Sequence, residues 1–367
     1  MQSIIINLEK YSMQLYNNLS NNERKNLLKE AGKDRLTISF YKYAKIGNPE
    51  IFRNHLFLFW NSIDVLGRIY VAHEGINAQL SVPADSFDEF KNHLDSIIFL
   101  KDVRLNIAIE QDIFSFLKLK VKVRKKIVSD GLDEGVFDVT DIGTHVNADE
   151  FNQLVEDHDT VLVDMRNHYE SEIGHFKNAI TPDVDTFRDS LDLIEEQLKE
   201  HKKTKKLVMY CTGGIRCEKA SAYYKHKGFK KVYQLEGGII NYARQVKSQG
   251  LENKFIGKNF VFDERRSEKI SDDIIANCHQ CGAPADVHVN CANEACHLLF
   301  IQCEACKIEM DSCCSSNCKE INSLPYQQQK LLRKGQGNSN DIFKKGRAEH
   351  LAKGKDLRNI FNILNLD

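Results

Sequence analysis

A cysteine and an arginine five positions apart, on a glycine-rich turn between a strand and a helix, constrain this chain most. Residues 207–210 (LVMY) predict a short buried strand, and residues 218–227 predict a helix that ends before Gly228. The loop between them, residues 211–216, contains two adjacent glycines, so its backbone can curl and point successive N–H groups at one centre. Strands and helices also alternate around it, which predicts a parallel, doubly wound sheet with the loop at its carboxyl edge.

The loop composition favours an anion at the cysteine sulfur. Inward N–H groups and the positive end of the following helix should lower the thiol pKa of Cys211, so that its sulfur is a thiolate near neutral pH. The same surroundings would stabilise a negatively charged persulfide. A lone cysteine after a strand is more often a small buried apolar residue. Here the candidate catalytic residues are Cys211 and Arg216, and the active-site loop between them is Thr212, Gly213, Gly214 and Ile215.

Length, charge and cysteine content set the wider limits. A chain of 367 residues suggests two or three domains, and a formal net charge of −1 indicates no polyanion partner for the chain as a whole. The sequence has neither a signal-peptide pattern nor an apolar run long enough for a membrane span, so we expect a soluble, cytoplasmic protein. Eleven cysteines in a reducing compartment favour metal binding and catalysis over disulfides.

Nine of these cysteines lie between residues 278 and 318, and eight of them form four closely spaced pairs. Short spacings let two thiolates reach one ion, so the region predicts about two zinc ions, which are structural because four thiolates leave no open position. Interleaved pairing, first pair with third and second with fourth, is favoured, but sequential pairing stays open. Cys313 is left over, and His279, His288 or His297 could replace a cysteine. The candidate ligands are Cys278, Cys281, Cys291, Cys296, Cys303, Cys306, Cys314 and Cys318.

The first part of the chain has its own pattern. From residue 36 to 128 the order is βαββαβ with an extra strand, which a ferredoxin-like α+β domain requires. Residues 73–77 (HEGIN) are explained by a hairpin, or by a polar turn that contacts a substrate. Residues 118–126 (KLKVKVRKK) alternate basic and apolar side chains, as a solvated edge strand or an RNA-binding sheet face would. The basic segment after Leu324 is either a solvated tail or a phosphate-binding one.

The second part resembles the rhodanese, or sulfurtransferase, domain. The resemblance rests on VDMRNHYESEIGHFKNA, on YCTGGIRCEKAS and on LEGGI, and it covers about residues 145–250. In the first of these segments, residues 160–166 predict a buried strand and residues 167–180 a loop. Apart from the resemblance, the strand-end pair Asp164 and Arg166 would be an ordinary ion pair of little energetic value.

The rhodanese resemblance assigns roles to several of these residues. It implies that Cys211 carries a persulfide, that Arg216 helps to close the cradle, and that Asp164 and Arg166 organise the neighbouring loop. Cys217 belongs to the same motif and could resolve a persulfide, or it could simply pack in the core.

The three-part layout, with HEGINAQLS, CTGGIRCEKAS and a cysteine-rich end, resembles the rhodanese-domain tRNA uridine hydroxylases. This resemblance implies an enzyme that converts wobble uridine to 5-hydroxyuridine in an oxygen-dependent reaction, with Cys211 as the essential residue. It also implies molecular oxygen as co-substrate and the anticodon arm of tRNA as partner. The alternative is a sulfurtransferase that passes sulfane sulfur from a Cys211 persulfide to a protein or thiol acceptor. A non-catalytic adaptor is a third hypothesis, which the complete loop disfavours.

The sequence therefore predicts an α/β rhodanese domain with a parallel doubly wound sheet, preceded by an α+β ferredoxin-like domain and followed by a small zinc-binding region. The expected parts are a helical leader at 1–30, the ferredoxin-like domain at 31–128, a linker at 129–144, the rhodanese domain at 145–252, the cysteine-rich region at 253–324 and a basic polar tail at 325–367.

Overall fold

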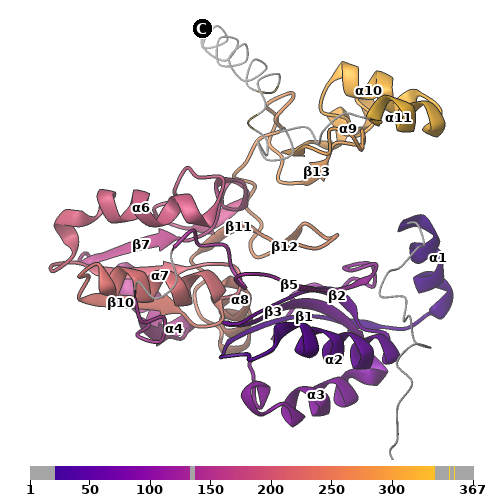
Figure 1. Ribbon diagram of the computed structural model, residues 1–367. Helices are drawn as coiled ribbons and strands as arrows, with labels where there is room; N and C mark the ends of the chain where they lie inside the picture. Colours follow the sequence, from indigo (N-terminus) through magenta and orange to yellow (C-terminus); the bar gives the residue numbers. More distant parts are fainter. Residues whose placement is uncertain (1–20, 133–136, 335–346, 348–350, 352–367) are drawn as a thin grey trace, which may run out of the picture.

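The computed structural model describes residues 21–132 and 137–334, together with Arg347 and Leu351 (Figure 1). Most of the predicted leader and most of the predicted basic tail lie outside these ranges. What is described of them is α1 (Asn21–Ala31) and α11 (Tyr326–Arg333). Among the described residues, no helix combines the length and apolar character that a membrane span requires.

The first domain is a five-stranded sheet with two helices on one face (Figure 1). The strand order is β4-β1-β3-β2-β5, and β5 runs parallel to β2 while the other neighbours are antiparallel. This arrangement confirms the predicted βαββαβ order with an extra strand. The elements are β1 (Arg35–Tyr43), α2 (Pro49–Ser62), β2 (Leu66–Ala72), β3 (Gly75–Pro83), α3 (Phe87–Ser96), β4 (Asn106–Ile107) and β5 (Leu119–Val123), with short 3-10 turns at Ala84–Ser86 and Ile98–Leu100.

Alternation along β1 gives the sheet two different faces. Ile38 and Phe40 are buried in a core with Trp60 of α2 and Phe90 of α3. Because side chains on a strand alternate, Tyr41 and its odd-numbered neighbours point to the opposite face, which no helix of this domain covers. That open face is turned toward the second domain.

The second domain contains a four-stranded sheet of order β6-β10-β9-β7 in which every pair is parallel. Two apolar clusters lie on opposite faces, one with α6 and α7 and the other with α4 and α8. The predicted parallel, doubly wound sheet is therefore confirmed. The elements are β6 (Thr144–Val146), α4 (Ala148–Glu156), β7 (Thr160–Asp164), α6 (Phe187–Gln197), a 3-10 turn at Lys199–His201, β9 (Lys206–Tyr210), α7 (Ile215–His226), β10 (Lys231–Leu235) and α8 (Gly238–Gln249).

The segment 167–180, predicted as a loop, contains α5 (His168–Ser171) and β8 (Gly174–Phe176). The loop prediction is wrong there because β8 pairs with β11 (Phe255–Phe260), a partner far away in the sequence. β11 also pairs with β12 (Ser267–Lys269), so the chain after α8 returns to the second domain before it enters the cysteine-rich region.

The cysteine-rich region consists of short elements at one end of the molecule (Figure 1). Cysteines provide much of its interior: Cys291, Cys296, Cys313, Cys314 and Cys318 lie in one buried cluster with Leu298 and Phe300. The region therefore has little apolar core of its own. Its elements are β13 (His288–Asn290), β14 (Leu299–Ile301), α9 (Glu304–Glu309) and α10 (Ser316–Ser323), followed by α11.

Candidate active site and cysteine clusters

Cys211 follows the last residue of β9 and its side chain is fully buried. The backbone N–H of Gly214 donates a hydrogen bond to its Sγ at 3.1 Å. Burial by itself would raise the pKa of the thiol. The hydrogen bond from the Cys217 thiol, the charge of Arg216 and the backbone N–H groups at Arg216 and Cys217 outweigh burial and lower the pKa of Cys211 to about 6. Cys211 is therefore a thiolate at neutral pH.

Two glycines allow the loop to take this shape. Gly214 has a φ of 100° at the N-cap of α7, so the helix begins at Ile215, three residues before the predicted start at Glu218. A β-carbon at Gly214 would lie 2.8 Å from the hydroxyl of Tyr41. Gly238 has a φ of 65°, and a β-carbon there would lie 2.4 Å from the carbonyl oxygen of Cys211. A larger side chain at Gly238 would displace the loop backbone, whereas at Gly214 it would strain the left-handed backbone and push the Tyr41 hydroxyl away.

Arg216 forms a buried ion pair with Glu170 of α5. Its Nη1 and Nη2 donate to the two carboxylate oxygens at 2.7 and 2.8 Å. Burial would raise the pKa of Glu170, but the charge and hydrogen bonds of Arg216 lower it, so both groups are ionised. The role of Glu170 was not predicted, although the residue lies in the quoted motif. One general rule could have pointed to Glu170: a buried arginine such as Arg216 needs a carboxylate beside it.

Asp164 and Arg166 are both fully buried. Arg166 donates to Asp164 through Nε at 2.9 Å and through Nη2 at 2.6 Å, and Nη2 also donates to the carbonyl oxygen of Gly174 at 2.6 Å. The pair thus joins the end of β7 to β8, on either side of the helix that carries Glu170. The pair is not the exposed strand-end pair that local sequence alone suggests, because β8 and β11 cover it.

Cys217 lies in the first turn of α7 and its side chain is fully buried. Burial raises the pKa of Cys217 well above its usual value, and the neighbouring Cys211 thiolate raises it further. Cys217 is therefore a protonated donor to the sulfur of Cys211. This contact places the second cysteine of the motif beside the first.

The Cys211 loop and the open face of the first domain enclose a cavity of about 620 Å³. This volume is in the range that takes a nucleoside-sized ligand. Its wall from the first domain is polar and aromatic, while the loop forms the wall from the second domain. The lining residues include Ser39, Tyr41, Arg68, Tyr70, Asn77, Gln79, Asn106, Asn167, Cys211, Thr212, Gly213, Ile215, Arg216 and Phe262.

Contacts from α7 hold the two walls of this cavity together. Tyr41 donates a hydrogen bond to Glu218 at 2.9 Å, and Lys219 donates to Glu74 at 2.7 Å. Glu74 lies in the two-residue turn between β2 and β3, so the hairpin prediction for residues 73–77 is confirmed. Asn77, from the same segment, lines the cavity. No local pattern could have found these pairs, because their members are more than 140 residues apart in the chain.

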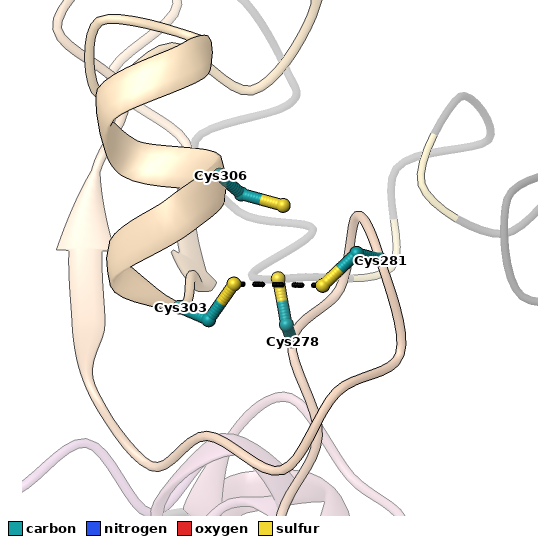
Figure 2. A group of neighbouring side chains, drawn as sticks. All are labelled: Cys278, Cys281, Cys303 and Cys306. Atoms are coloured by element: carbon teal, nitrogen blue, oxygen red, sulfur yellow. Dashed lines mark hydrogen bonds between the residues drawn. The ribbon is translucent and has the colours of Figure 1, made fainter.

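The eight paired cysteines gather into two groups, and in each group the sulfur atoms lie within 4.8 Å of one another. Four thiolates around zinc at about 2.3 Å would be about 3.8 Å apart. The Sγ atoms of Cys281 and Cys303 are 3.5 Å apart, and those of Cys296 and Cys314 are 3.6 Å apart, so the spacing fits such an ion. One group is Cys278, Cys281, Cys303 and Cys306 (Figure 2), and the other is Cys291, Cys296, Cys314 and Cys318.

The grouping is the interleaved arrangement, in which the first pair joins the third and the second joins the fourth. The hairpin of β13 and β14 brings Cys303 and Cys306 back beside Cys278 and Cys281. Within the described part of the chain, Cys313 and the three candidate histidines belong to neither group. Cys313 is buried next to the second group, and its carbonyl oxygen accepts a hydrogen bond from Gln280 at 3.0 Å. His279 contacts the carboxylate of Glu172 at 2.9 Å.

Three family profiles match successive parts of the chain. They are described as an acylphosphatase-like domain at residues 35–127, a rhodanese-like domain at 147–245 and a rhodanese C-terminal region at 256–319. Proteins named tRNA uridine(34) hydroxylase, from Yersinia pestis (strain Pestoides F) and Pectobacterium carotovorum, are 54% identical over 91% of this chain and 94% of their own length.

Solved structures similar to this chain include a rhodanese-like domain from Anabaena and one from Staphylococcus aureus. The Anabaena domain is 17% identical, with a TM-score of 0.26, and the match covers 32% of this chain and 80% of that one. The Staphylococcus aureus domain is 26% identical, with a TM-score of 0.23, and the match covers 27% of this chain and 90% of that one.

The parallel sheet, the cysteine loop at its carboxyl edge and the profile match define a rhodanese-like protein with an added acylphosphatase-like domain. Sequence identity to a relative over nearly the whole chain is stronger evidence of family membership than one shared domain. The chain belongs to the tRNA uridine(34) hydroxylase family.

Proposed function

We propose that this protein hydroxylates uridine 34 of tRNA at C5 and that Cys211 is the residue that attacks the base. The single observation that carries the proposal is that a buried thiolate opens into a cavity whose other wall belongs to a second domain. A sulfur carrier for small donors has no need of that second wall. The name shared by the full-length relatives favours the hydroxylase over the sulfurtransferase alternative.

The chemistry we propose begins with addition of the Cys211 sulfur to C6 of uracil. The electron pair of the C5=C6 bond moves toward C5 and the C4 carbonyl oxygen, which makes C5 nucleophilic. Hydroxylation replaces the hydrogen at C5 by a hydroxyl group, and loss of that hydrogen as a proton expels the sulfur and restores the double bond. With molecular oxygen as co-substrate, one oxygen atom enters the base and the other leaves as water, and the two electrons and two protons that this takes would come from two external thiols, which leave as a disulfide.

Arg216 is a positioning residue in this scheme. Both terminal nitrogens of its guanidinium are held by Glu170, so its charge stays beside the loop and stabilises the thiolate. The same charge, with the N–H of Gly214, would stabilise a persulfide on Cys211. The thiolate and the persulfide are therefore both forms that the site can hold.

We further propose that each four-cysteine group binds one structural zinc ion. The sulfur spacing fits tetrahedral zinc, and four thiolates leave no position open for a substrate. The metal would supply folding free energy to a region with little apolar core. A tRNA substrate, bound through its anticodon arm, also supports a cytoplasmic location.

Nucleoside mass spectrometry tests the proposed function. Cells that lack the protein are complemented with the wild type or with Cys211→Ala, and 5-hydroxyuridine in their tRNA is measured. We expect the modified nucleoside to return only with the wild type. Equal levels with and without the protein would reject the hydroxylase and leave the sulfurtransferase as the function to pursue.

A further inference from the structure

Five polar side chains lie side by side across the open face of the first domain. The register of the sheet pairs Asn106 with Ser39, Ser39 with Gln79, Gln79 with Arg68, and Arg68 with Lys120. Register partners in neighbouring strands point to the same face, so these residues form one line that crosses all five strands. We call this line the polar row.

One end of the polar row lies at the Cys211 loop. The side-chain amide of Asn106 donates a hydrogen bond to the carbonyl oxygen of Gly213 at 3.3 Å. Ser39, Gln79 and Arg68 line the same cavity as Cys211. The row therefore leaves the loop and continues along the cavity wall toward the edge of the sheet.

The other end of the polar row is strongly basic. Lys120 and Lys122 alternate with the buried Val121 on the edge strand β5, and both are exposed, as is Arg68 on β2. The Arg124 guanidinium lies 5.5 Å from the centre of the Tyr70 ring, which also lines the cavity. Burial lowers the pKa of Lys120, and so do the nearby charges of Lys118, Lys122, Arg68 and Arg24.

These cations have no acidic partner among the residues that the structure describes. In the described part of the chain, no carboxylate forms an ion pair with Arg68, Lys120 or Lys122. Lys126, three residues after β5, does have a partner, because it donates to Asp130 at 2.6 Å. A solvated edge strand would explain charge on β5 alone. It does not explain why that charge continues a polar line that ends at the Cys211 loop.

We propose that the polar row binds the single-stranded RNA next to the reacting uridine, with Arg68, Lys120 and Lys122 holding its phosphates. The inference rests on the proposed function, and it names the surface that the tRNA uses. An enzyme that acts on a base must take that base out of its stack, which leaves the flanking backbone extended and available to a sheet. Ser39 and Lys120 are three strand spacings apart, about 14 Å, so Lys120 lies beyond the reacting base, whereas Arg68, one strand nearer, lies at the cavity wall.

A salt titration of tRNA binding tests this surface. The triple variant Arg68→Gln, Lys120→Gln, Lys122→Gln removes three exposed charges and should fold like the wild type. Fluorescence anisotropy with labelled tRNA should show roughly tenfold weaker binding. The slope of log affinity against log salt should fall by about 2, since each lost phosphate contact contributes about 0.7.

The matched control is Lys203→Gln, Lys230→Gln, Lys231→Gln, which removes the same charge from exposed lysines near the amino ends of β9 and β10. This variant should keep the affinity and the slope of the wild type. Equal loss in both triple variants would mean a general charge effect and would overturn the proposal. Unchanged binding by the first variant would overturn it as well, while leaving the hydroxylase function intact.

A second measurement needs no variant. Ultraviolet cross-linking of the wild-type protein to tRNA, followed by peptide mass spectrometry, should identify peptides from β2 and β5, with Tyr70 among the attachment sites. Cross-links confined to other surfaces would overturn the polar row but not the function. A wild-type protein that binds no tRNA at any salt concentration would overturn both.

Discussion

Lys219, on the helix that follows the Cys211 loop, donates a hydrogen bond to Glu74 on the β2–β3 turn of the other domain at 2.7 Å. The same ammonium group also bonds to Asp130, and only 3% of the Lys219 side chain is exposed. A buried cation therefore joins the first domain, the segment that follows it and the helix whose N-terminus holds the thiolate. This contact joins the two domains that form the walls of the cavity.

Substitution Lys219→Ala should destabilise the protein by about 2 kcal/mol, because it removes one of the two ammonium groups that bond to the buried carboxylate of Asp130 and leaves only Lys126. Urea unfolding followed by circular dichroism measures the change. The control Lys231→Ala, at an exposed site, should change stability by less than about 0.5 kcal/mol. Similar small effects for both variants would show that Lys219 does not hold the domains together.

The reactivity of Cys211 should rise with pH at lower values than for an ordinary cysteine. The thiolate reacts and the thiol does not, so alkylation should increase through pH 6 and level off near pH 7. An unperturbed thiol would show its inflection near pH 8.5. Pulse labelling with iodoacetamide and mass spectrometry of the Cys211 peptide gives the profile. An inflection at pH 8 or above would contradict the described loop electrostatics.

Substitution Arg216→Gln should move this inflection upward. Arg216 lowers the pKa of Cys211 through its positive charge and its backbone N–H, and the substitution removes only the charge. The variant also leaves Glu170 buried without its partner, so its stability should be measured in parallel. Lys231→Gln removes a charge at an exposed site and should leave the profile unchanged. An unmoved inflection in Arg216→Gln would assign the low pKa to the hydrogen bonds alone.

Zinc stoichiometry should distinguish the two pairings of the cysteines. The double variant Cys281→Ser, Cys303→Ser alters one group, so elemental analysis should find about one zinc ion per chain. The double variant Cys281→Ser, Cys296→Ser alters both groups and should lose both ions. Sequential pairing would give the opposite result for the two variants.

Cys313→Ser is the control for this series, because Cys313 is buried beside the second group but is not a member of it. This variant should keep about two zinc ions per chain. Loss of an ion in Cys313→Ser would mean that the ligand set includes Cys313.

Much of the candidate site could be predicted because its signals are local. The cysteine loop, its glycines and the start of a helix occupy a dozen consecutive residues, and each cysteine pair spans at most six. These features depend only on the spacing of nearby residues, so they can be predicted before the fold is known. The start of α7 was missed by three residues because the left-handed Gly214 lets the helix begin inside the loop.

The residues that were missed act across long separations. Glu170 reaches Arg216 only because β8 and β11 pair behind it, and that pairing leaves no trace in the pattern around residue 170. The basic alternation of β5 was visible in the sequence, but its alignment with Arg68 and Gln79 depends on the register of three strands. Register is set by which side chains the whole sheet can bury.

Spacing along the chain was enough to predict the candidate cysteine loop, the alternation of elements in both domains and the four closely spaced cysteine pairs. Only the tertiary structure shows which wall faces Cys211, which carboxylate binds Arg216 and which cysteine pairs gather into one group. Those outcomes depend on packing and pairing between segments that are distant in sequence, where a buried charged group is stable only with an opposite charge or hydrogen-bond partner beside it.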